Sequence, residues 1–186
     1  CPQENFWVVT GERYVDLVKQ QVPQLLDDHI IAEPQGRGTA PCIAYACWKI
    51  AQKHPDANIV FTPSDALVID VTEFRRVIRA ALEFTESQHS IVTIGIKPDR
   101  PETGYGYIAE GEKVEGTEIC KVDSFREKPS LEVAKDYLRQ GIYLWNAGIF
   151  VWNVNTITTA LRTYTPALAT TMDEMSVAFY TDSEKE

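Results

Sequence analysis

Apolar segments typical of β-strands alternate with helical patterns along this chain of 186 residues, and this alternation limits the possible folds more than any other feature. Strands are predicted at residues 6–10, 29–33, 58–62, 90–96 and 143–152. Helices are predicted at residues 12–22, 39–53, 71–87, 130–141 and 155–164. Such an order is typical of an α/β protein in which helices cover a sheet.

The strand patterns are of two kinds. The run Ile91-Val92-Thr93-Ile94 predicts a strand that is buried on both faces, as in a parallel sheet. Residues 104–121 instead alternate and are interrupted by glycines, which predicts a hairpin or another antiparallel excursion. We therefore expect a Rossmann-like, doubly wound, mostly parallel sheet with one antiparallel excursion, in a single domain.

Residues with strong positional preferences mark the expected helix ends. Thr39 is expected to be the N-cap of one helix, with Pro41 in its first turn, and Ser130 is expected to cap another. Gly141 suits the end of the helix that Ser130 begins.

Composition excludes several classes of partner. The net charge of -9 argues against binding to a nucleic-acid backbone. No apolar run approaches the roughly 20 residues of a membrane span. The spacing of the cysteines fits neither a zinc site nor a redox pair, so Cys42 and Cys47 are expected to be small buried residues. We expect a cytoplasmic protein.

A carboxylate follows the strand predicted at residues 58–62. Ligands of open α/β sheets bind beyond the carboxyl ends of the strands, where Asp65 is expected to lie. A hard oxygen ligand at this position suits Mg²⁺ that is shared with substrate phosphates. The alternative is that Asp65 only caps a turn.

Three further segments carry groups that suit a sugar phosphate. Glu127 and Lys128 could bind sugar hydroxyls and a phosphate, or form a surface ion pair; Pro129 predicts an extended Lys128. The glycines around Tyr105 permit close approach of a ligand to the backbone or form an ordinary turn. Asn146, in an aromatic strand, needs a hydrogen-bond partner from the backbone or from a ligand.

Other chemistries have less support. His29, His54 and His89 do not share a metal-binding spacing, and the chain has no nucleophile elbow, Walker loop or dinucleotide fingerprint. The segment Gly36-Arg37-Gly38 precedes a helix and could meet an anion at the helix N-terminus.

Five motifs occur in order along nearly the whole chain: Glu33-Pro34-Gln35-Gly36-Arg37-Gly38-Thr39-Ala40-Pro41, Pro63-Ser64-Asp65, Arg100-Pro101-Glu102-Thr103-Gly104-Tyr105-Gly106-Tyr107-Ile108, Phe125-Arg126-Glu127-Lys128-Pro129 and Trp145-Asn146-Ala147-Gly148-Ile149-Phe150. In this order and spacing they resemble mannose-1-phosphate guanylyltransferases. The resemblance implies a nucleotidyltransferase fold of the nucleotide-diphospho-sugar type. It also implies Mg²⁺-dependent transfer of GMP from GTP to mannose 1-phosphate, giving GDP-mannose and pyrophosphate.

The resemblance also assigns roles to single residues. It implies that Asp65 binds the metal and that Lys128 lies beside the sugar phosphate, and both are expected to be catalytic. The mannose is expected to contact Gly104, Tyr105, Glu127 and Asn146. The guanine pocket is expected to be bordered by Glu33, Arg37 and Thr39.

The chain departs from the family pattern in several places. Where the family usually reads Ser-Asp-His and Gly-Arg-Asn-Thr, this chain has Ala66 after Asp65 and Gly38 before Thr39. The family's N-terminal glycine-rich loop and its second, C-terminal metal-binding aspartate are not in these 186 residues. Residues 1–186 are therefore expected to be an incomplete nucleotidyltransferase domain.

Three functional hypotheses follow. The first is that the parent protein is an active guanylyltransferase and that this segment alone is inactive and prone to associate as a homo-oligomer. The second is a non-catalytic module that binds sugar nucleotides. A metal-dependent glycosyltransferase is disfavoured because Asp65-Ala66-Leu67 lacks the second acid of an Asp-x-Asp motif.

Overall fold

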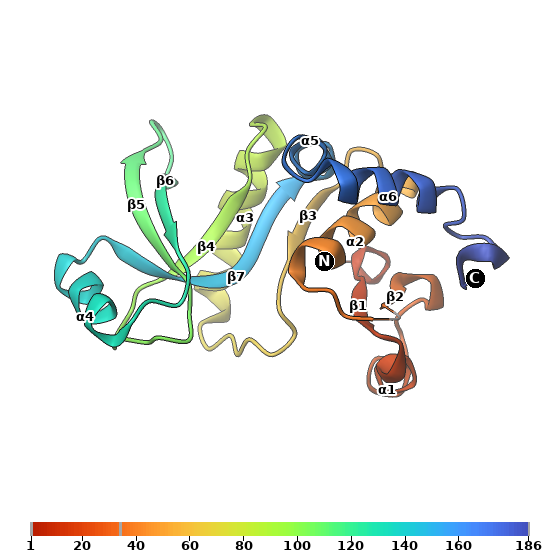
Figure 1. Cartoon of the computed structure of the whole chain (residues 1–186), viewed down its shortest axis with the longest axis horizontal. Coiled ribbons are helices and arrows are strands. Elements are labelled where there is room, and N and C mark those ends of the chain that lie inside the picture. Colours follow the sequence, from red (N-terminus) through yellow and green to blue (C-terminus); the bar gives the residue numbers. More distant parts are fainter. Residues whose placement is uncertain (1, 34, 186) are drawn as a thin grey trace. The chain divides into compact units, whose positions relative to one another are not determined.

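The structure, a computed structural model, describes residues 2–33 and 35–185 and divides the chain into two compact units (Figure 1). One, here called the terminal unit, comprises Cys1–Ala57 and Val154–Glu186. The other, the central unit, comprises Asn58–Asn153. Pro34, which belongs to the first of the five motifs, lies outside the described residues.

The terminal unit begins with a parallel β-α-β arrangement. Strand β1 (Val8–Gly11) is followed by helix α1 (Val15–Gln21) and by strand β2 (Ile30–Glu33). The two strands pair in parallel, with Val8 opposite Ile30. Short 3-10 helices cover Gln3–Asn5, Glu12–Tyr14, Asp27–His29 and, near the end of the chain, Asp182–Lys185. The predicted parallel pairing is therefore confirmed in this unit.

Three helices form the core of the terminal unit. Helix α2 (Thr39–Lys53) packs against α5 (Val154–Tyr164) and α6 (Pro166–Ser176), which also pack against each other. Helix α2 has the predicted bounds, and it buries Cys47 almost completely, as expected. Helix α6 was not predicted, although Thr165 followed by Pro166 is a recognisable start signal because proline suits the first turn.

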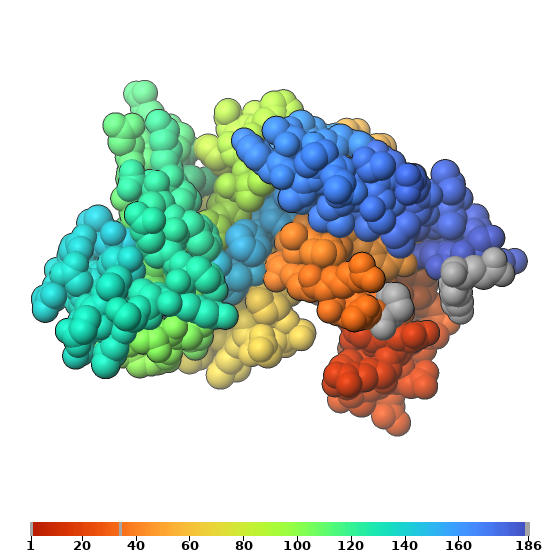
Figure 2. Space-filling model, in the orientation of Figure 1, coloured from red at the N-terminus to blue at the C-terminus, as the bar shows by residue number. Residues whose placement is uncertain are grey.

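The central unit contains a mixture of strands and helices. Along the chain these are β3 (Asn58–Phe61), α3 (Val71–Ser87), β4 (Val92–Ile96), β5 (Tyr107–Lys113), β6 (Cys120–Arg126), α4 (Leu131–Gln140) and β7 (Tyr143–Asn153). All five strands belong to one sheet. Strands β5 and β6 form the predicted hairpin, which stands out from the rest of its unit (green in Figure 2).

Strand β7 organises this sheet and accounts for the main departure from the predicted fold. It pairs antiparallel with β3 along one edge and with β4 along the other, since Phe150 is opposite both Phe61 and Thr93. Strands β3 and β4 are therefore parallel to each other, as a β-α-β pattern predicts, but β7 lies between them. The α/β class is confirmed, whereas a mostly parallel sheet is wrong for the central unit, in which every described strand pairing is antiparallel.

The burial predicted for residues 91–94 is also wrong. Ile91 precedes β4 and is 45% exposed. Residues Val92, Thr93 and Ile94 are only partly buried. The strand lines an open hollow together with residues of α3, β5 and β6, so this face is not closed over within the described structure.

Two of the predicted helix ends are confirmed and one is wrong. The Ser130 hydroxyl accepts a hydrogen bond from the Val133 amide, and Gly141 ends α4 in the left-handed conformation, with φ of 71°. Thr39, by contrast, is the first residue of α2; the N-cap is Gly38, and it has no side chain to cap the helix. Within the described residues, no helix is both long and apolar enough to cross a membrane.

Candidate active site

Two of the predicted sugar-binding residues, Glu127 and Asn146, come together beside Gly106 in the central unit. A Cβ atom added to Gly106 would lie 2.9 Å from Glu127 Oε2 and 3.6 Å from the Asn146 Cβ. The backbone N–H of Asn146 also donates a hydrogen bond of 2.8 Å to the Gly106 carbonyl. The Glu127 carboxylate thus lies beside Gly106, in the space that a side chain at this position would occupy, and the three residues lie around one point.

The Asn146 side chain is held in one orientation. Its Oδ1 accepts hydrogen bonds from the Gly148 amide at 3.1 Å and from the Thr93 hydroxyl at 3.2 Å. The Nδ2 group has no hydrogen-bond partner within residues 2–33 and 35–185. Of the two kinds of partner predicted for Asn146, the backbone supplies one to its side-chain oxygen, and the hydrogens of Nδ2 are available to a ligand.

The turn that contains Gly104 and Tyr105 is fixed by Glu102. Its Oε1 accepts hydrogen bonds of 3.0 Å from the amides of Thr103 and Gly104, and these bonds lower the pKa of the Glu102 carboxyl. The Glu102 carbonyl accepts a further bond of 2.8 Å from the Tyr107 hydroxyl. The Gly104 amide is therefore already used, so only the rest of its backbone can contact a ligand.

Aromatic rings surround this turn. The Tyr105 ring meets the buried Trp145 edge-on, with centroids 5.4 Å apart and planes at 83°. The guanidinium of Arg100 lies over the same indole, 5.0 Å from its centroid. Apolar faces and a cation beside hydroxyl-binding groups suit recognition of a sugar phosphate.

The backbone of Lys128 contradicts the prediction from its sequence. Pro129 favours an extended preceding residue, yet Lys128 has a φ of 41°, in the left-handed region. Its ammonium lies 3.6 Å from the Glu127 carboxylate, and both side chains are about two-thirds exposed, at 64% and 66%. The predicted ion pair thus exists, and it is held on a strained backbone of the kind that is concentrated at functional sites.

Asp65 lies in a turn after β3, as predicted, and its side chain is exposed. The preceding Pro63 packs on Gly148, where an added Cβ would lie 3.2 Å from the proline Cγ, so this turn lies next to the Asn146 segment. No group of three or more metal-binding side chains occurs in the described part of the chain. Mg²⁺ commonly takes one or two carboxylates plus substrate phosphates. Asp65 thus offers one exposed carboxylate to a cation, within the one or two that such a site uses.

The predicted nucleotide-binding residues belong to the terminal unit. Glu33 ends β2 and is partly buried, which raises the pKa of its carboxyl group. Arg37 and Thr39 are exposed at the start of α2. Cys42, one turn into α2, is only half-buried and not fully buried as expected; burial, with a smaller effect of Glu33, raises the pKa of its thiol to about 11.

Gly38 has a structural role that the sequence did not reveal. Its φ of 93° and ψ of -178° fall in a backbone region that is essentially restricted to glycine. A residue with a side chain would be strained in this conformation at the entry into α2.

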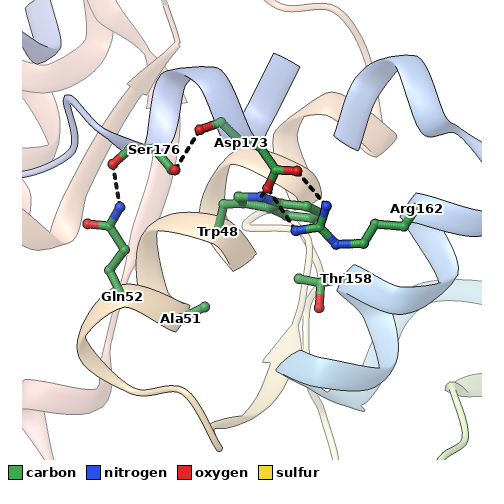
Figure 3. A pocket seen from close by; sticks show the side chains of 7 residues that line it. All are labelled: Trp48, Ala51, Gln52, Thr158, Arg162, Asp173 and Ser176. Atoms are coloured by element: carbon green, nitrogen blue, oxygen red, sulfur yellow. Dashed lines mark hydrogen bonds and ion pairs between the residues drawn. The ribbon is translucent and has the colours of Figure 1, made fainter. Parts of the chain in front are cut away.

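A cavity of about 250 Å³ in the terminal unit lies between α2, α5 and α6 (Figure 3). Asp173 accepts hydrogen bonds from the Trp48 indole at 2.8 Å and from Arg162 at 2.7 Å, and Arg162 also lies over the Trp48 ring. None of the predicted site residues lines this cavity. Its polar groups satisfy one another and join the three helices.

We expect the Asp173→Asn variant to lose less stability in acid than the unchanged protein does. The hydrogen bond from Arg162, followed by that from Trp48, lowers the pKa of the Asp173 carboxyl to about 2. Because its pKa in an unfolded chain is about 3.9, the ionised group stabilises the fold above about pH 4, and this contribution disappears as the pH falls towards 2. Solvent screening keeps the effect modest, since the side chain is 46% exposed. Urea denaturation across this pH range measures it, with Glu174→Gln on the same helix as control; equal acid sensitivity of Asp173→Asn and the unchanged protein would contradict it.

Comparison with known proteins places this arrangement in a family. The nucleotidyl transferase family matches residues 3–183. The chain belongs to the nucleotidyl transferase family. It is 38% identical over 147 residues to mannose-1-phosphate guanylyltransferase of Escherichia coli, covering 75% of this chain and 32% of the relative. It is also 38% identical over 151 residues to mannose-1-phosphate guanylyltransferase ManC of Salmonella typhimurium strain LT2, covering 77% of this chain and 31% of the relative. The chain thus spans about a third of the length of these curated relatives.

Solved structures agree on the fold. A crystal structure described as mannose-1-phosphate geranyltransferase from Thermus thermophilus superposes with a TM-score of 0.86 at 26% identity, covering 99% of this chain and 52% of that one. A crystal structure described as mannose-6-phosphate isomerase from Helicobacter pylori gives a TM-score of 0.78 at 23% identity, covering 92% and 64%. The second likeness concerns the fold alone.

Sequence reasoning missed several residues of the site. Glu102 and Trp145 lie inside the recognised motifs, but no role was predicted for either. Thr93 lies outside the motifs, and only its hydroxyl, in an otherwise apolar strand, distinguishes it. Its contact with Asn146 depends on the pairing of β4 with β7, which local patterns do not specify.

Proposed function

We propose that the protein to which this chain belongs transfers GMP from GTP to mannose 1-phosphate, producing GDP-mannose and pyrophosphate. The observation that carries the proposal is the convergence of Gly106, Glu127 and Asn146 on one point of the central unit. A carboxylate acceptor and an amide donor beside a glycine without a side chain match the alternating hydroxyl groups of a hexose. The similarity to mannose-1-phosphate guanylyltransferases supports the choice of substrate.

In the proposed reaction a phosphate oxygen of mannose 1-phosphate attacks the α-phosphorus of GTP. A new P–O bond forms as the bond to the leaving pyrophosphate breaks in line with it. The protein contributes positioning and neutralisation of charge, because the phosphoryl groups themselves provide the reacting atoms. Mg²⁺ would neutralise the phosphates, with Asp65 as one of its ligands.

Residues of each unit have separate proposed roles. In the central unit, Glu127 accepts hydrogen bonds from mannose hydroxyls, Asn146 donates to them, and Lys128 neutralises the sugar phosphate. Backbone atoms of Gly104 and the Tyr105 ring complete the sugar site. In the terminal unit, Glu33, Arg37 and Thr39 border the guanine, whose N1–H and N2–H edge suits a carboxylate acceptor.

A second candidate is a module that binds the sugar nucleotide without turning it over. Gly38 favours it, because the glycine removes a side-chain amide from a segment expected to contact the nucleotide. Formation of GDP-mannose and of pyrophosphate by the full-length protein distinguishes the two candidates. Equal yields of both products support the enzyme, whereas saturable binding of GDP-mannose without turnover supports the binding module.

A further inference from the structure

Thr93 contacts the proposed sugar site from a strand that carries none of its predicted residues. Its hydroxyl lies 3.2 Å from Asn146 Oδ1, across the register shift that separates Thr93 from Gly95 in the pairing of β4 with β7. The side chain is half-buried, and the β4 strand around it is otherwise apolar.

The hydrogen bonds around Asn146 determine which way its amide faces. A backbone N–H can only donate, so the 3.1 Å bond from Gly148 identifies the acceptor atom as Oδ1. The Thr93 hydroxyl must then donate to the same oxygen, and together the two bonds occupy both of its lone pairs. The Nδ2 group is left as a pure donor.

The rest of the Asn146 surroundings agree with this orientation. The Asn146 backbone N–H donates a hydrogen bond of 2.8 Å to the Gly106 carbonyl, which holds the residue beside Gly106. The Glu127 carboxylate over Gly106 supplies the complementary acceptor. The site therefore offers a carboxylate acceptor and an amide donor, and hydrogen bonds orient the donor.

We propose that Thr93 is a positioning residue that makes Asn146 a donor-only group and so sets the preference of the site for a ligand acceptor atom, such as a sugar hydroxyl oxygen. This role rests on the proposed function of the same site. Without the Thr93 hydroxyl, one lone pair of Oδ1 is free to accept from a ligand or from water. The side-chain amide of Asn146 is then less firmly oriented, and the site has a weaker preference for a ligand acceptor atom.

The test compares Thr93→Val with Thr93→Ser in the full-length protein. Valine keeps the shape of threonine but lacks the hydroxyl, and serine keeps the hydroxyl. We expect Thr93→Val to raise KM for mannose 1-phosphate about three- to tenfold, the range for loss of one hydrogen bond, and to leave KM for GTP unchanged. Thr93→Ser should restore the original value.

A double-mutant cycle separates this role from a merely structural one. If Thr93 acts through Asn146, Thr93→Val has no further effect on KM in an Asn146→Ala background. Additive effects of the two substitutions, equal changes in both KM values, or an unchanged KM for mannose 1-phosphate in Thr93→Val would each overturn the proposal.

Direct binding distinguishes failure of this role from failure of the proposed function. Titration calorimetry with mannose 1-phosphate applies whether or not the protein turns it over. If Thr93→Val binds mannose 1-phosphate as tightly as the unchanged protein does, the role of Thr93 alone is overturned. An unchanged protein that neither binds it nor forms GDP-mannose would overturn the proposed function and the role of Thr93 together.

Discussion

Replacing Asp65 by asparagine should lower kcat for GMP transfer about 10²- to 10³-fold in the full-length protein, the range seen when one electrostatic stabiliser is removed from an active site. Asparagine keeps the size and one oxygen of the side chain but removes the negative charge that attracts Mg²⁺. Because Asp65 is exposed in a turn, the substitution should leave the fold intact.

The control for Asp65 is Asp123→Asn, since Asp123 is an exposed aspartate of β6 in the same unit. The metal requirement gives a second readout: the Mg²⁺ concentration for half-maximal activity should rise in Asp65→Asn and remain unchanged in Asp123→Asn. If Asp65→Asn kept activity and Mg²⁺ dependence close to those of the unchanged protein, Asp65 would be only the turn residue that the sequence left as an alternative.

Replacing Lys128 by glycine should make the protein more stable and much less active. Glycine adopts a φ of 41° without strain, so relief of the strain at Lys128, less the entropy cost of glycine, gives a gain of about 1 kcal/mol in the free energy of unfolding. Loss of the ammonium should lower kcat/KM about 100-fold, because a charge beside the sugar phosphate is removed.

Lys128→Gln is the matched variant, because it removes the charge and keeps the strain. It should lose about as much activity as Lys128→Gly and show no gain in stability. Urea denaturation and steady-state kinetics on the two variants separate strain from charge. Full activity in Lys128→Gln would show that the ion pair with Glu127 is only a surface contact.

The features that could be predicted from the sequence are those that local patterns control. Helices α2 and α3 have the predicted bounds, because helical periodicity lies within the segments themselves. The β5–β6 hairpin was also predictable, since its strands are close in sequence. The position of β7 between β3 and β4 was not, because β7 lies about 50 or more residues away along the chain from both strands and no local signal specifies such pairing.

The site shows the same division. The resemblance assigned Glu127 and Asn146 to one sugar site, and the structure brings them together. The orientation of the Asn146 side-chain amide, however, depends on Thr93, which no motif includes. Lys128 shows the limit of a local rule: the preference for an extended residue before proline is overridden where the chain passes from the end of β6 to the Ser130 cap of α4 within a few residues.

The most direct test of the proposed function is to incubate the full-length protein with GTP, mannose 1-phosphate and Mg²⁺ and to measure GDP-mannose and pyrophosphate in the same samples. The proposal predicts that the two products appear in equal amounts, that both require the sugar phosphate, and that Asp65→Asn nearly abolishes both. A folded full-length protein that binds mannose 1-phosphate but forms neither product would contradict it.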